Sequence, residues 1–124
     1  MGAMPMERPT DADKELFRAV VGDFREATVK PMFGQLAAFV NGNMFACLLG
    51  SRIGVKILDD EIRNELRAIP GSGEFAPGGR PMKQIVAVPA QWASTPELIS
   101  EWALVALSQV STLPPKKTQP KMTT

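Results

Sequence analysis

The chain has 124 residues, of which 44% are hydrophobic and 22% charged, and its 14 basic and 13 acidic residues give a net charge of +1. These values indicate one soluble globular domain with a single core and exclude a strongly basic, nucleic-acid-binding body. With one cysteine, Cys47, and no histidine or tyrosine, the composition excludes an internal disulfide, nucleophile–histidine catalysis and histidine-bearing zinc sites.

The N-terminal region predicts a flexible segment followed by a helix. No apolar run approaches the about 18 residues of a transmembrane helix, and residues 1–9 lack the features of a signal peptide. We therefore expect a cytoplasmic protein whose residues 1–9 are flexible and partly a cloning remnant. Thr10 and Asp13 have the spacing of a capping box, which predicts a helix over 11–26. Its apolar stripe is expected to pack on the core.

Asn41-Gly42 predicts a two-residue β-hairpin turn, because both residues readily adopt the positive φ that a type I′ turn requires. The turn joins strands predicted over 36–40 and 43–49. A two-residue turn pairs Phe39 with Met44, and every further pair follows from that register.

The segments on either side of the hairpin predict two more strands. Gly50-Ser51 indicates a second tight turn, which leads into a strand over 52–57 with alternating apolar and basic residues. Residues 28–33 include Pro31 and predict a short edge strand, with Gly34 at a bulge or turn.

The predicted register sorts the side chains onto two faces, and both are apolar. Face one, expected to lie under the helices, consists of Ala37, Phe39, Met44, Ala46, Leu48, Ile53, Val55 and Ile57. Face two consists of Leu36, Ala38, Val40, Phe45, Cys47 and Leu49. Because an antiparallel sheet in a monomer usually exposes a polar face, we expect face two to be an interface, in the simplest case that of a homodimer. The alternative is that the first helix of the same chain covers face two. The variant Phe45→Glu distinguishes the two hypotheses. It should change the assembly state and leave the fold largely intact if face two is an interface, and it should unfold the chain if face two is core.

The second half of the chain begins with a short helix and an irregular region. Asp59-Asp60 begin the helix and Pro70-Gly71 end it. Residues 82–88 predict a further strand, and 74–76 a short one before it.

A long amphipathic helix and a tail complete the chain. The helix begins either at a Ser94–Glu97 capping box or at a Thr95-Pro96 pair, and Pro114-Pro115 ends it. Residues 10–113 are thus the expected folded domain, and residues 114–124 a disordered basic tail.

Candidate chemical groups are few. The best ligand loop consists of Gly78, Gly79 and Arg80, because glycines allow close approach to the backbone and Arg80 could hold a carboxylate or phosphate. The same residues also fit an ordinary loop. Cys47, in mid-strand, is expected to be a packing residue.

Three consecutive acids at the start of the second helix are interpreted as cap and dipole partners rather than catalytic carboxylates. They are Asp59, Asp60 and Glu61. No catalytic, cofactor-binding or metal-binding residue is predicted, so we expect no enzymatic activity and no cofactor.

Several short motifs occur in the order and spacing of one protein family. They are Met32-Phe33-Gly34, the segment from Phe39 to Ala46, Gly79-Arg80-Pro81-Met82, Val88-Pro89, Glu97-Leu98, Glu101-Trp102-Ala103 and Ala106-Leu107. Over residues 14–110 the chain resembles the N-terminal domain of the TfoX/Sxy competence regulators. The resemblance implies an α+β fold, with a meander-type antiparallel sheet of about five strands and flanking helices, similar in plan to type III secretion chaperones. It also implies a cytoplasmic bacterial protein that regulates DNA uptake through transcription, alongside other regulators, rather than by catalysis.

Three functional hypotheses follow. The favoured one is a protein-interaction or regulatory module that binds a partner or a second copy through face two, without contact with a membrane. The second is direct nucleic-acid binding through Arg80 and three tail lysines, Lys116, Lys117 and Lys121. The third is an anionic small-molecule site at Gly78–Arg80.

Overall fold

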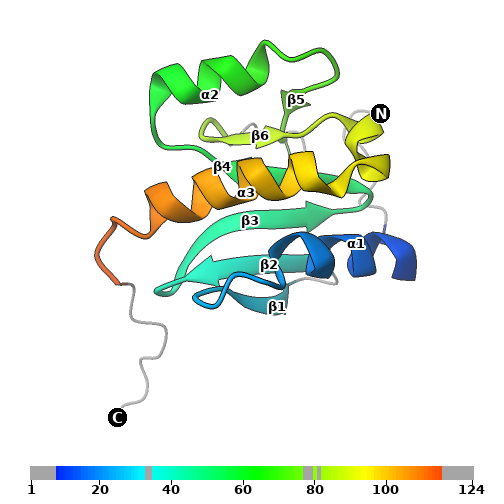
Figure 1. Ribbon diagram of the computed structural model, residues 1–124, viewed down its shortest axis with the longest axis horizontal. Helices are drawn as coiled ribbons and strands as arrows, with labels where there is room; N and C mark the ends of the chain where they lie inside the picture. Colours follow the sequence, from blue (N-terminus) through cyan, green and yellow to red (C-terminus); the bar gives the residue numbers. More distant parts are fainter. Residues whose placement is uncertain (1–7, 33–34, 77–79, 81, 116–124) are drawn as a thin grey trace.

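The computed structural model describes residues 8–32, 35–76, 80 and 82–115, which form one layer of helices on one antiparallel sheet (Figure 1). The helices are α1 (Asp11–Val21), α2 (Asp60–Arg67) and α3 (Pro96–Val110). The strands are β1 (Thr28–Met32), β2 (Gln35–Val40), β3 (Asn43–Leu49), β4 (Arg52–Lys56), β5 (Gly73–Glu74) and β6 (Ile85–Ala87). Their order in the sheet is β1-β2-β3-β4-β6-β5. The predicted α+β class is confirmed, with six strands in place of about five.

The predicted β2–β3 hairpin is confirmed. Asn41 and Gly42 adopt φ values of 53° and 79°, both in the left-handed region that a type I′ turn requires. Phe39 pairs with Met44, as predicted. The turn into β4 is also present, with Gly50 at a φ of 60°.

The start of α1 is confirmed, and its end comes earlier than predicted. The Thr10 hydroxyl accepts a hydrogen bond from the Asp13 amide at 3.1 Å, while the Asp13 carboxylate accepts one from the Thr10 amide at 2.9 Å. The helix ends at Val21, with Gly22 as its C-cap, rather than at residue 26. The apolar stripe misled the prediction, because Phe24 lies beyond the helix and still packs on the core.

A β-bulge changes the register of the hairpin beyond its first pairs. Phe39 lies opposite Met44, but the next residue of β2, Ala38, lies opposite Ala46, so Phe45 is the extra residue of β3. Because side chains alternate along a strand, this one-residue shift places the β3 residues beyond the bulge on the opposite face, relative to β2, from the one predicted. The predicted pairs of Ala37 with Ala46 and of Leu36 with Cys47 are therefore wrong.

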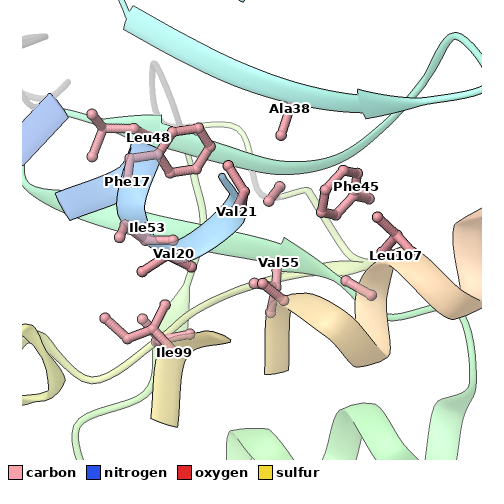
Figure 2. Packing of buried hydrophobic residues seen from close by; sticks show 14 of the residues in the cluster. Phe17, Val20, Val21, Ala38, Phe45, Leu48, Ile53, Val55, Ile99 and Leu107 are labelled. Carbon is pink, nitrogen blue, oxygen red and sulfur yellow. The ribbon is translucent and has the colours of Figure 1, made fainter. Parts of the chain in front are cut away.

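The main core lies between the sheet and the helices, and Figure 2 shows its centre. Phe17, Val20 and Val21 of α1 and Ile99 and Leu107 of α3 enter it from the helix layer. The strands contribute Ala38, Phe45, Leu48, Ile53 and Val55. Ser100 of α3 donates a hydrogen bond to the Val20 carbonyl oxygen of α1 at 3.1 Å, which fixes the two helices to each other.

The later elements are shorter than predicted. The strand predicted over 82–88 is reduced to β6, and in place of the short strand predicted at 74–76 the structure has β5 at Gly73–Glu74. A 3₁₀ turn, Ala90–Ser94, was not predicted. Of the two predicted starts of α3 the structure has the second, with Thr95 as N-cap and Pro96 at the first helical position.

Candidate functional site

The predicted interface, face two, does not exist as one surface. Four of its six residues belong to the core under the helices: Leu36, Ala38, Val40 and Phe45. Phe45 is 0% exposed, and its ring centroid lies 6.4 Å from that of Phe24. The prediction failed because the bulge directs both Phe45 and Ala46 toward the helices. The alternative, cover by the first helix of the same chain, is correct in part, because these four residues share one core with residues of both α1 and α3.

The other side of the sheet carries a second apolar cluster, which we call the outer face. Its buried members are Ala37, Cys47, Phe75, Ile85 and Ala87, and its half-buried members are Phe39, Met44 and Leu49. No residue of α1, α2 or α3 belongs to it. Cys47 and Leu49 of the predicted interface are here, together with Ala37, Phe39 and Met44, which were predicted to lie under the helices.

A row of small residues crosses the outer face from strand to strand. Cross-strand pairs connect Ala37 of β2 to Cys47, Cys47 to Gly54, Gly54 to Ala87, and Ala87 to Gly73 of β5.

Phe75 covers this row at Gly54. A Cβ atom placed on Gly54 would lie 2.8 Å from Phe75 Cδ1 and 2.7 Å from Ile85 Cγ2. Gly54 therefore lets the aromatic ring lie against the backbone of β4. Sequence analysis did not predict this contact. Gly54 lies in an otherwise ordinary alternating strand, so the pattern gave no reason to place an aromatic ring against it.

Cys47 is a packing residue of the outer face. Burial raises the pKa of its thiol from 9.0 to about 12, although a backbone hydrogen bond from Gly54 acts in the opposite direction. The thiol is thus protonated at neutral pH, whereas a nucleophilic cysteine needs a readily formed thiolate.

The chain belongs to the TfoX N-terminal domain family. Its match to this family covers residues 19–110, which runs from the last turn of α1 to the last residue of α3 and includes all six strands. The resemblance expected from the sequence motifs is confirmed. Comparisons with curated proteins and with solved structures found no match.

Within this TfoX N-terminal domain, one of the three acids at the start of α2, Asp59, has the predicted cap role. The Asp59 carboxylate accepts a hydrogen bond from the Ile62 amide at 2.9 Å, and Asp60 forms an ion pair with Arg63. The described residues contain no group of three or more potential metal ligands among His, Cys, Asp and Glu. None of the helices in the described ranges is long and apolar enough to cross a membrane.

The predicted ligand loop is described only at Arg80, which is exposed. Gly78 and Gly79 lie outside the described residues, as do Gly34 and the tail lysines Lys116, Lys117 and Lys121.

A basic hollow that the sequence analysis missed lies between α2 and the β5–β6 hairpin. It has a volume of about 550 Å³ and is lined by Arg63, Arg67, Ser72, Gly73, Glu74 and Lys83. The spacing of two arginines four residues apart on one face of α2 could have indicated it, because two cations at that spacing repel each other.

Proposed function

We propose that this TfoX N-terminal domain is a regulatory protein-interaction module without catalytic activity, which acts in the bacterial cytoplasm on the transcriptional control of DNA uptake. Membership of the TfoX N-terminal domain family supports the regulatory role. The outer face supports the interaction role, and it replaces the face predicted from the sequence.

The observation that carries the proposal is the apolar character of the outer face. The uncovered face of a two-layer fold is usually polar, because it meets water. Here Phe39, Met44 and Leu49 are half-buried around a row of small residues, and no described helix lies over them. A second apolar surface would remove their remaining exposed area from water, which is favourable by about 25 cal/mol per Å² of apolar area.

The simplest partner is a second copy of the chain. Two identical outer faces related by a two-fold axis would bury the same residues on both copies. Pairing through the edge of the sheet is less favourable, because edge strand β1 carries Lys30 and Pro31, residues that discourage the addition of another strand.

Sedimentation velocity of the wild type and of Phe39→Glu tests the interaction. We expect a wild-type dimer and a folded Phe39→Glu monomer. The matched control is Leu104→Glu, because Leu104 is 49% exposed on α3, on the opposite side of the molecule. It should remain dimeric. A wild type that is monomeric at all concentrations, or a dimer that Phe39→Glu leaves intact, contradicts the proposed interface.

The regulatory role is tested in the source cell. Deletion of the gene should lower the transcripts of the DNA-uptake genes, and the wild type, but not Phe39→Glu, should restore them. Transcript levels that do not change after deletion would contradict the regulatory role, but they would not affect the conclusion from sedimentation about the interface.

A further inference from the structure

The hollow has an excess of positive charge, since it is lined by three basic side chains, Arg63, Arg67 and Lys83, and by one acidic side chain, Glu74. Arg67 Nη2 donates a hydrogen bond of 2.6 Å to the backbone carbonyl oxygen of Lys83, which holds the guanidinium beside that residue. Within the described ranges, neither Arg67 nor Lys83 forms an ion pair. The excess of positive charge favours binding of an anion in the hollow.

Arg63 lines the same hollow, but its guanidinium is already engaged in the fold. Its Nη1 donates to the carbonyl oxygens of Ile57 and Leu58 at 2.9 and 3.4 Å, and its Nη2 is paired with Asp60. Its Nε is buried and has no hydrogen-bond partner among the described residues. Because a ligand in the hollow cannot reach this buried atom, Arg63 contributes to the wall of the hollow and is not a donor to the ligand.

The other lining groups indicate what the rest of the ligand contains. Glu74 brings a carboxylate, and the Ser72 hydroxyl, which donates to the Leu66 carbonyl oxygen at 2.8 Å, still has acceptor capacity. Both groups can accept hydrogen bonds from hydroxyls, whereas Glu74 would repel a second negative group. None of the described residues that line the hollow is aromatic, so these residues offer no stacking surface of the kind that a nucleobase uses.

We propose that the hollow between α2 and the β5–β6 hairpin binds a phosphorylated sugar. Arg67 and Lys83 hold the phosphate, since charge-assisted hydrogen bonds to phosphate are the strongest available to these groups. Glu74 and Ser72 accept hydrogen bonds from the sugar hydroxyls. The volume of about 550 Å³ suits a small metabolite and exceeds what a single phosphate ion needs.

Isothermal titration calorimetry with ribose 5-phosphate as the probe tests this proposal. Ribose 5-phosphate should bind, with an affinity that falls as salt is added. Inorganic phosphate should bind more weakly, and ribose should not bind. Adenosine monophosphate should bind no tighter than ribose 5-phosphate, because the site offers nothing for the base.

Lys83→Gln is the central variant, because Lys83 is exposed and its side chain supports no described contact of the fold. It should weaken ribose 5-phosphate binding about ten-fold, the effect of one hydrogen bond to a charged group. Arg18→Gln, which removes the same charge from the exposed side of α1, should leave binding unchanged. Glu74→Gln should reduce the preference for ribose 5-phosphate over inorganic phosphate.

Four results would overturn the proposal. The first is no binding at millimolar ribose 5-phosphate, and the second is an affinity for ribose 5-phosphate that Lys83→Gln leaves unchanged. The third is an equal loss of affinity in Lys83→Gln and Arg18→Gln. The fourth is a DNA duplex or adenosine monophosphate that binds more tightly than ribose 5-phosphate and depends on Lys83. Because neither Lys83 nor Arg18 belongs to the outer face, the comparison of these two variants does not depend on the oligomeric state.

Discussion

The two faces of the sheet are built from the same strands and differ in what covers them. On the helix face, α1 and α3 bury residues such as Phe45, Val40 and Val55 to 1% exposure or less. On the outer face, Phe39 and Met44 stay half-buried, although they belong to the same hairpin. The comparison shows that the helices cover one face of this hairpin completely, whereas apolar side chains of the same hairpin stay partly exposed on the other face.

The largest expected effect is on the helix face. Phe45→Ala removes a fully buried ring and leaves a cavity between β3 and the helices, which should lower the free energy of unfolding by about 3–5 kcal/mol. Urea denaturation measures the loss. The same burial predicts that Phe45→Glu unfolds the chain, in contrast to the expectation from sequence. A loss below about 1 kcal/mol would mean that Phe45 is not in the core.

Gly54→Ala tests the packing on the outer face. The added methyl group would lie within 3 Å of both Phe75 and Ile85, and such overpacking costs about 1–3 kcal/mol. Gly73→Ala is the matched control, because its Cβ would meet only Arg52 Nη2 at 3.8 Å, an ordinary contact. Thermal unfolding of the two variants should therefore differ, and equal midpoints would contradict the position of Phe75.

We expect the buried thiol of Cys47 to cause a loss of stability at high pH. Its pKa is raised by burial to about 12 in the folded chain, so the folded state keeps a proton that the unfolded state releases. The stabilisation is complete below pH 9 and is lost between pH 9 and about 12. Over that range the wild type should lose up to about 1.4 kcal/mol per pH unit relative to Cys47→Ala. Parallel pH profiles of the two proteins would contradict this burial.

The smallest expected effect concerns the rim of the outer face. Lys30 is exposed, and its Nζ lies 5.6 Å from the centroid of the Phe39 ring. At an exposed site such a cation–π contact contributes less than about 1 kcal/mol. Lys30→Gln should therefore barely change the urea midpoint, and a loss comparable to that of Gly54→Ala would show that this rim is part of the core.

Much of the fold could be predicted because its signals are local. Asn41-Gly42 determined the hairpin turn, and Thr10 with Asp13 determined the start of α1, since each depends on backbone geometry within a few residues. The bulge could not be predicted. Phe45 and Ala46 are both apolar, so the side-chain pattern gave no sign that one residue of β3 lacks a partner.

The candidate sites were harder to predict, because their residues come from separate elements. Lys83 precedes β6 and approaches Arg67 of α2 only through a backbone hydrogen bond that depends on tertiary packing. Similarly, Phe75 follows β5 and contacts Gly54 of β4, although β6 lies between these two strands in the sheet. Composition and spacing do not encode these contacts.

The most direct test of the two-face account compares two neighbouring residues of β2, Phe39 on the outer face and Val40 in the core. We would measure the urea unfolding of Phe39→Gln and Val40→Gln at the same protein concentration. The account predicts a loss above about 2 kcal/mol for Val40→Gln, which buries an amide among apolar side chains, and a much smaller loss for Phe39→Gln. Equal losses, or a larger loss for Phe39→Gln, would contradict the assignment of the faces and with it the proposed interaction surface.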